Sequence, residues 1–127
     1  MVDFDGFVRL DEEGHLDSLD ARSFEEPVVI YKHSTTCTLS SWARDEMGAF
    51  VRESGLPVYQ VVVQHARPLS NAIAERYGIR HESPQVILLF RGMPQFHASH
   101  RRVTAEAVQQ ALSEVAGQES GVSEEPY

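Results

Sequence analysis

Two patterns of apolar residues alternate along the middle of this chain. Short unbroken apolar runs, rich in β-branched residues, are typical of buried strands, whereas apolar residues that recur every three or four positions indicate amphipathic helices. The runs predict strands at Pro27–Tyr31, Val58–Val63 and Gln85–Phe90, and the recurring pattern predicts helices at Thr38–Ser54 and Arg67–Tyr77. Gly55 and Gly78 directly follow the two helices and suit left-handed C-caps.

The order of these elements predicts the topology of the sheet. Two strands separated by one helix form a βαβ unit with parallel strands. After the third strand, a turn at Arg91–Pro94 and an alternating strand at Gln95–Ser99 predict an antiparallel hairpin at a sheet edge. Thr104 is a candidate N-cap for a last helix that ends near Gly117. The prediction is an α/β fold in which helices flank a mixed four-stranded sheet, in the order β-α-β-α-β-β-α.

The two ends of the chain carry weaker patterns. Near the N-terminus, a short strand is suggested by Phe4, Phe7, Val8 and Leu10, and a short helix by Leu16, Leu19 and Phe24. The last residues are acidic and lack periodicity, which is typical of a disordered tail. We therefore expect one domain at residues 1–116, including an N-terminal extension, and a disordered tail at residues 117–127.

Composition and charge narrow the class of protein. The chain has 127 residues, of which 42% are hydrophobic, and a formal net charge of −8. An acidic protein is a poor match for nucleic acid, whose phosphates require a basic surface. No stretch approaches the ~20 apolar residues that span a bilayer, and the acidic start does not resemble a signal peptide. We expect a cytoplasmic protein without membrane or nucleic-acid partners.

The only cysteine, Cys37, lies at the predicted junction between the first strand and its helix. A helix N-terminus together with a cation lowers the pKa of a thiol from about 8.5 towards neutrality, and Lys32 or His33 could supply the cation. The alternative is a small buried hydrophobic residue. The hydroxyl-rich neighbours of Cys37 favour a reactive thiolate. Because one cysteine cannot form an internal disulfide, its partner sulfur must come from another molecule.

The element order and two local motifs resemble the thioredoxin-like proteins. Cys37-Thr38-Leu39-Ser40 takes the position of the family's C-x-x-C motif, with serine in place of the second cysteine. Tyr77-Gly78-Ile79, followed by Ser83-Pro84, resembles the segment that carries the family's cis-proline. The resemblance implies that the Ser83–Pro84 bond is cis and faces Cys37.

Within this fold, the sequence looks like the monothiol bacilliredoxins. Three blocks carry the likeness, which extends over Pro27–Leu112: KHSTTC from Lys32, ARPLSNAIAERYGIRHESPQ from Ala66, and HASH from His97. The family usually reads Cys-Pro-Ile-Ser, so Thr38 and Leu39 depart from it. The residue that separates the cysteine from its helix tunes the acidity and redox potential of the thiol.

The resemblance implies removal of bacillithiol from S-bacillithiolated proteins by exchange at Cys37. It implies no bound cofactor: bacillithiol is a co-substrate, and a separate bacillithiol disulfide reductase participates indirectly. Ser40 could donate a hydrogen bond to the sulfur or only cap a helical turn. The expected substrate-binding residues, for which a solvated loop position is the alternative, are Lys32, His33, Thr35, Thr36, Thr38, Ser83, Pro84 and Gln85. No metal site is expected, because His97 and His100 lack a third nearby donor.

Other functions are compatible with a C-x-x-S motif. The substrate thiol could be glutathione or another low-molecular-weight thiol, as in glutaredoxin-like or arsenate-reductase-like proteins. Alternatively, two chains could share an iron–sulfur cluster through Cys37, although the Cys-Gly-Phe-Ser motif typical of such carriers is absent. A noncatalytic adaptor with an incidental cysteine is the last alternative.

Overall fold

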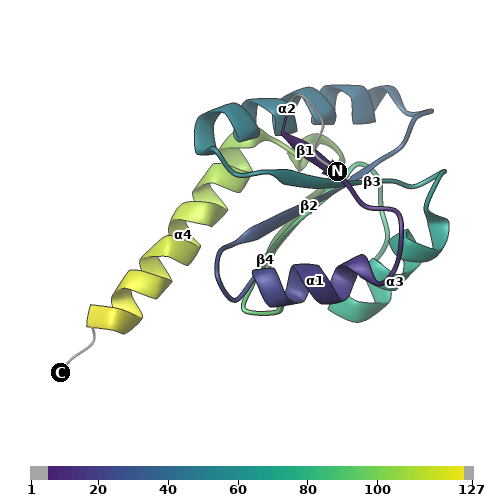
Figure 1. The fold of residues 1–127 in the computed structure, drawn as a ribbon. Helices are drawn as coiled ribbons and strands as arrows, with labels where there is room; N and C mark the ends of the chain where they lie inside the picture. The colour runs from purple at the N-terminus through teal and green to yellow at the C-terminus, as the bar shows by residue number, and fades with distance from the viewer. Residues whose placement is uncertain (1–5, 125–127) are drawn as a thin grey trace.

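A mixed five-stranded sheet organises the protein, whose computed structural model describes residues 6–124 (Figure 1). The strands, in the order β1-β3-β2-β4-β5 across the sheet, are Phe7–Arg9 (β1), Val58–Val62 (β3), Val28–His33 (β2), Gln85–Phe90 (β4) and Met93–Ser99 (β5). Strands β1, β3 and β2 are parallel, whereas β4 runs antiparallel to both β2 and β5. The predicted parallel βαβ unit and edge hairpin are confirmed.

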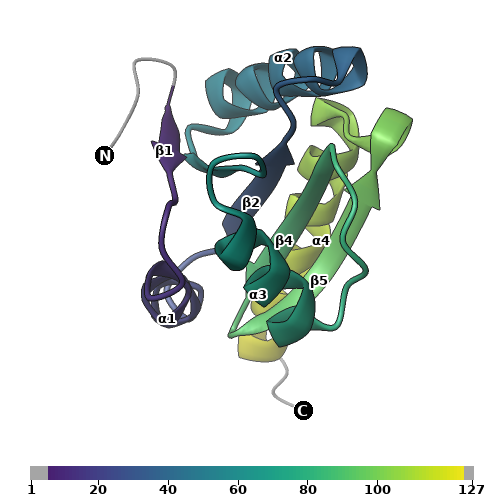
Figure 2. The same ribbon diagram turned by 90° about the vertical axis from the view of Figure 1, so that its right-hand side faces the viewer.

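Helices cover both faces of this sheet (Figures 1 and 2). They are α1 (His15–Arg22), α2 (Thr38–Ser54), α3 (Arg67–Tyr77) and α4 (Ala105–Glu124), with a short 3-10 helix, η1 (His100–Arg102), before α4. One apolar cluster joins the sheet to α2 and α4, and the other joins it to α1 and α3. Alternation along β2 supplies both clusters, because Val29 and Tyr31 belong to the first and Val28 and Ile30 to the second.

The ends of α2 and α3 and the start of α4 agree with the sequence. Helices α2 and α3 end at Gly55 and Gly78, whose φ angles of 76° and 66° are left-handed. At the start of α4, the Ala107 N–H donates to Thr104 Oγ1 at 3.1 Å. Thr104 is therefore the N-cap that the sequence predicts.

The N-terminal extension is part of the sheet, where the sequence predicts a central sheet of four strands. Strand β1 pairs in parallel with β3, and the Phe7 side chain is buried in the α2–α4 cluster. Phe24 differs from its prediction, because it follows α1 and is 63% exposed. Phe4 lies outside the described residues.

Two boundaries near the C-terminus also differ from the prediction. The hairpin turn consists of Arg91 and Gly92, both with positive φ, while Met93 and Pro94 already belong to β5. An edge strand tolerates Pro94 because one row of its backbone groups has no neighbouring strand. Helix α4 continues past Gly117 to Glu124, while residues 125–127 lie outside the described residues. The disordered tail stays a prediction.

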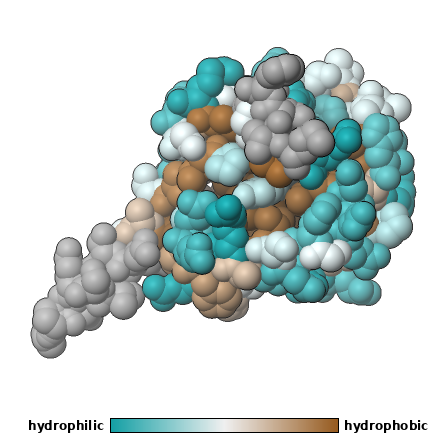
Figure 3. All heavy atoms as spheres, in the orientation of Figure 1, coloured by the Kyte–Doolittle hydropathy of each residue, from teal (hydrophilic) through white to brown (hydrophobic). Residues whose placement is uncertain are grey.

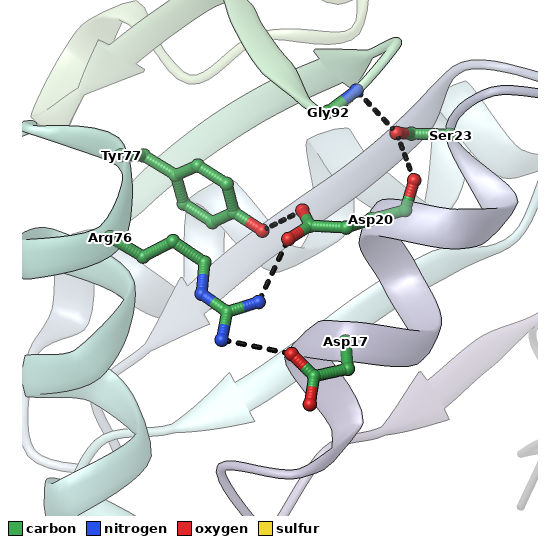
Figure 4. Close-up of polar contacts among 6 residues, drawn as sticks. All are labelled: Asp17, Asp20, Ser23, Arg76, Tyr77 and Gly92. Carbon is green, nitrogen blue, oxygen red and sulfur yellow. Dashed lines mark hydrogen bonds and ion pairs between the residues drawn. The ribbon is translucent and has the colours of Figure 1, made fainter.

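Polar contacts hold α1 against α3 and the hairpin (Figure 4). The Arg76 guanidinium donates to Asp20 at 2.8 Å and to Asp17 at 3.0 Å, and the Tyr77 hydroxyl donates to Asp20 at 2.6 Å. Ser23 Oγ donates to the Asp20 carbonyl and accepts the Gly92 N–H. These contacts fix the N-terminal segment at the end of the sheet to which the hairpin turn belongs.

The surface that carries β1 combines polar and apolar side chains. Figure 3 shows apolar residues in the middle of this face, with hydrophilic residues gathered around them. Within residues 6–124, no helix is both long and apolar enough to cross a membrane.

Candidate active site around Cys37

Cys37 is the N-cap residue of α2. Its backbone is extended, with φ −114° and ψ 122°, and its carbonyl accepts the Ser40 N–H at 3.0 Å. Cys37 is partly exposed, and its neighbours Thr35, Thr36 and Thr38 are exposed. The first N–H groups of a helix lack intrahelical partners and carry partial positive charge, which favours an anion at this position. The location predicted for Cys37 is therefore confirmed, and Cys37 is not one of the buried core residues.

The loop before Cys37 is held by one side chain, Gln64, which follows β3. Gln64 Oε1 accepts the Thr35 N–H at 3.1 Å, and Nε2 donates to Ser34 Oγ at 2.8 Å and to Thr36 Oγ1 at 3.3 Å. Ser34 Oγ and Thr36 Oγ1 are also 3.3 Å apart. One amide thus connects three consecutive residues of the loop and restricts the backbone that leads to the sulfur.

Ser40 connects the same loop to the first turn of α2. Its side chain is buried, and its Oγ accepts the Ser34 N–H at 3.2 Å. Its carbonyl accepts the hydroxyl proton of Tyr31 at 2.9 Å. Ser40 therefore positions the loop, while donation from its hydroxyl to the sulfur stays a prediction.

Tyr31 and His33 form a polar cluster beneath this loop. Tyr31 Oη is 3.0 Å from His33 Nδ1. Because the single phenol proton goes to Ser40, the short contact requires the proton on His33 Nδ1. Burial raises the pKa of Tyr31 well above its usual value, so the phenol stays protonated. Burial, together with the Arg44 charge, lowers the pKa of His33. His33 is therefore mostly neutral at pH 7 and does not supply the predicted cation.

Lys32 occupies the opposite face of β2. Its side chain has no exposed surface, and Nζ donates to the Ser70 carbonyl at 3.0 Å and to His81 Nδ1 at 3.1 Å. Burial lowers its pKa to about 8. The sequence places this cation near Cys37 and bacillithiol, but strand alternation directs it towards α3 instead. In this conformation a solute cannot contact it.

The segment from Ser83 to Gln85 runs beside the start of this loop. Antiparallel pairing sets Gln85 opposite Lys32, so Pro84 and Ser83 run alongside His33 and Ser34. The Ser83–Pro84 bond is cis, as the resemblance implies. Gln85 is 1% exposed and its Nε2 donates to the Arg80 carbonyl and to Ser99 Oγ. Gln85 therefore connects the segment before the cis bond to the end of β5, and its side chain does not reach solvent.

The structure thus divides the predicted site residues into two groups. Around the thiol it gathers Ser40, the exposed threonines Thr35, Thr36 and Thr38, and the half-buried His33. The partly exposed Ser83 and the buried Pro84 belong to the same group, because they run alongside the start of this loop. Lys32 and Gln85 are fully covered, so contact with a substrate is not supported for them. His97 and His100 are exposed, and His100 Nε2 is 3.7 Å from Glu82 Oε1. No cluster of three or more metal-ligating side chains occurs in residues 6–124.

Sequence reasoning missed the roles of Gln64 and Tyr31. The sequence pattern places Gln64 just past the predicted strand Val58–Val63 and Tyr31 at the end of the predicted strand Pro27–Tyr31, and it gives neither residue a role at the thiol. A polar residue two positions after the end of β3, at the same sheet edge as the Cys37 loop, is the signal that could have identified Gln64. The carboxyl ends of neighbouring parallel strands meet at that edge.

The fold and the site together define a thioredoxin-fold protein with one partly exposed cysteine at the start of α2. A structure described as a candidate oxidoreductase with a thioredoxin fold is 29% identical, with a TM-score of 0.75, covering 84% of this chain and 93% of its own. The thioredoxin of Fasciola hepatica is 13% identical, with a TM-score of 0.68, covering 84% and 97%. That of Schistosoma mansoni is 17% identical, with a TM-score of 0.68, covering 85% and 96%.

The family follows from the sequence match. The model of the monothiol bacilliredoxin BrxC family matches residues 8–108. This chain therefore belongs to the monothiol bacilliredoxin BrxC family.

Proposed function

We propose that this protein is a cytoplasmic thiol–disulfide oxidoreductase that removes bacillithiol from S-bacillithiolated proteins. The observation that carries the proposal is a single, partly exposed cysteine at the N-cap of α2, in a chain of the BrxC family. The 29% identical structure, described as a candidate oxidoreductase, also supports redox chemistry. Bacillithiol acts as a co-substrate and is not retained.

The reaction requires two exchanges at one sulfur. The Cys37 thiolate attacks the bacillithiol sulfur of the protein–bacillithiol disulfide, and the protein thiolate leaves. Cys37 then carries bacillithiol in a mixed disulfide. Because Ser40 cannot act as a resolving thiol, a second bacillithiol thiolate attacks this adduct and releases bacillithiol disulfide, which restores Cys37. A separate bacillithiol disulfide reductase then regenerates bacillithiol.

The surrounding residues support these exchanges in distinct ways. The dipole at the start of α2 stabilises the anion that attacks and the anion that leaves in the second step. The exposed Thr35, Thr36 and Thr38 offer hydroxyl groups to the sugar of bacillithiol, and the backbone of Ser83 can pair with the extended substrate chain. The loop contacts of Ser40 and Gln64 keep the sulfur at the helix end.

Mass spectrometry of one target protein, loaded separately with bacillithiol and with glutathione, tests the proposal. We expect the bacillithiol mass to leave the target and to appear transiently on Cys37, and the Cys37→Ser variant to leave the target loaded. Faster removal of glutathione than of bacillithiol would assign the protein to a different thiol. A loaded target that is unchanged by the wild-type protein would contradict the proposal altogether.

A further inference from the structure

A concave surface begins two residues beyond Cys37, between the start of α2 and η1. A pocket of about 550 Å³ is lined by Leu39 of α2, by Glu82, and by residues 97–102 of β5 and η1. A second pocket, of about 240 Å³, shares Leu39 and Arg101 with the first and adds Trp42, one turn further along α2. Because Glu82 directly precedes Ser83–Pro84, this surface adjoins the loop beside the thiol.

The larger pocket is basic on an otherwise acidic protein. His97, His100, Arg101 and Arg102 line it, with Glu82 as the only acidic residue of the lining. The whole chain has a net charge of −8, so this gathering of basic residues is a local exception. Both arginines are exposed, and neither has an ion-pair partner within the described part of the chain.

The acidic group of this pocket is itself partnered. Glu82 Oε1 lies 3.7 Å from His100 Nε2. A hydrogen bond from Ser99, together with the charge of His100, lowers the pKa of Glu82. Glu82 is therefore ionised at neutral pH, and its single charge offsets at most one of the two guanidinium charges. The pocket keeps a net positive charge.

Two hydrogen bonds connect the backbone that carries the basic residues to the segment at the cis peptide bond. His100 has a φ of 58°, and its N–H donates to the Pro84 carbonyl at 2.9 Å. Ser99 Oγ, one residue earlier, accepts from Gln85 Nε2 at 3.2 Å. These two bonds fix the start of η1 against the residues that follow the cis bond. The positions of Arg101 and Arg102 relative to the thiol are consequently set by the fold.

Resting on the proposed function, we infer that this pocket binds the carboxylates of the small thiol that Cys37 exchanges. A guanidinium matches a carboxylate with two parallel hydrogen bonds. Leu39, two residues after Cys37, is part of the pocket lining, so a thiol whose sulfur is attached to Cys37 can extend along the start of α2 and place an acidic group at Arg101 and Arg102. The pocket thereby selects low-molecular-weight disulfides that carry carboxylates over neutral ones.

Two small disulfides that differ in charge test this inference without bacillithiol. In each, the Cys37 thiolate attacks one sulfur, forms a mixed disulfide and releases one coloured thiolate or thione. The anionic disulfide of thionitrobenzoate carries a carboxylate on each ring, whereas dithiodipyridine is neutral. Release is followed by stopped-flow absorbance at neutral pH and low salt, for the wild type and for the double variant Arg101→Gln, Arg102→Gln. The matched control is Arg52→Gln, Arg91→Gln, which removes two exposed arginines that do not line the pocket.

In the pocket variant we expect the reaction of Cys37 with the anionic disulfide to be about fivefold slower and the reaction with the neutral disulfide to stay within about twofold of the wild-type rate. This is the size of effect expected from the loss of two solvent-exposed charge contacts. The control pair should leave both rates within about twofold, and salt should reduce only the anionic rate of the wild type. Equal slowing of both disulfides, or no slowing of either, would overturn the inference. Activity on a bacillithiolated protein is measured separately. Its absence, with charge selection intact, would reject the proposed function and leave the pocket assignment standing.

Discussion

The two faces of β2 carry polar clusters of opposite character. Towards α2, the Tyr31 hydroxyl contacts His33 and donates to the Ser40 carbonyl, close to the loop that holds Cys37. Towards α3, Lys32 donates to the Ser70 carbonyl and to His81. The first cluster is composed of groups that are neutral at pH 7, whereas the second contains a buried ammonium.

This difference shows that neighbouring residues of one strand can influence separate properties: one the surroundings of the thiol, the next the stability of the fold. Because side chains alternate, a shift of one position along β2 moves a group from the face that packs against α2, below Cys37, to the face that packs against α3. Tyr31 donates to the carbonyl of Ser40, whose Oγ accepts the Ser34 N–H, so loss of the Tyr31 hydroxyl should affect the first turn of α2. Lys32 has no exposed surface and lies among residues of α3, so its charge should affect stability.

The largest effect is expected from the thiol itself. Cys37→Ser should reduce exchange with any mixed disulfide to the uncatalysed rate, because the chain has no other cysteine. The fold should persist, since serine differs from cysteine by one atom at a partly exposed N-cap and is itself a favourable capping residue. Circular dichroism and disulfide release measure the two properties. Residual exchange above the background would show that another group carries the reaction.

The buried ammonium should make stability depend on pH. The pKa of Lys32 is lowered from its ordinary 10.5 to about 8. Between these two pKa values the unfolded chain therefore binds more protons than the folded protein. The free-energy cost of burying the charged ammonium is complete below the folded pKa and is lost as the pH rises towards the unfolded pKa. From about pH 8 to about pH 9.5 the free energy of unfolding should rise by about 1.5 kcal/mol relative to Lys32→Met. Urea unfolding of both proteins measures this difference.

Parallel pH profiles of wild type and Lys32→Met would contradict the assignment of a buried, charged Lys32. The comparison is made below pH 10 because the raised pKa values of Tyr31 and Tyr77 act in the opposite direction at higher pH. At these higher pH values each tyrosine ionises in the unfolded chain but stays protonated in the folded protein, so the free energy of unfolding falls as the pH rises.

On the other face of β2, Tyr31→Phe should cost about 1 kcal/mol of unfolding free energy, because the buried hydroxyl donates to Ser40 and contacts His33. Tyr59→Phe is the control, since in the described residues the Tyr59 hydroxyl has no hydrogen-bond partner, and it should change stability less. Denaturant midpoints at one pH provide the measurement. Equal effects of the two substitutions would mean that the Tyr31 hydroxyl adds nothing specific.

A smaller effect is expected from Gln64, which acts on the loop from β3. Gln64→Ala removes three contacts with residues 34–36 and should slow the reaction of Cys37 with a neutral disulfide about threefold, the equivalent of less than one hydrogen bond. Gln64→Glu should have an intermediate rate, because a carboxylate still accepts the Thr35 N–H but cannot donate to the hydroxyls. His65→Ala is the neighbouring control. A control variant as slow as Gln64→Ala would indicate a general loosening of the loop.

Local patterns in the sequence determined most of the fold. Apolar runs without charge predicted β2, β3 and β4, and the three- and four-residue period with a following glycine predicted α2 and α3 to the residue. The position of Cys37 at the start of α2 followed from the same patterns, because strand, polar loop and helix are each encoded by adjacent residues. The likeness of the KHSTTC and HESPQ blocks led to the BrxC family, which the family match confirms.

Only the tertiary structure decided what lies around the thiol. Strand β1 is three residues long, too short for a clear pattern, and its pairing with β3 joins segments about fifty residues apart. The contacts of Gln64 with the loop, and the packing of η1 against α2 that forms the basic pocket, likewise depend on segments distant in the sequence. The direction of Lys32 depends on which face of β2 lies under Cys37. A one-dimensional pattern records that side chains alternate, but the assembled sheet and helices determine which neighbour each face receives.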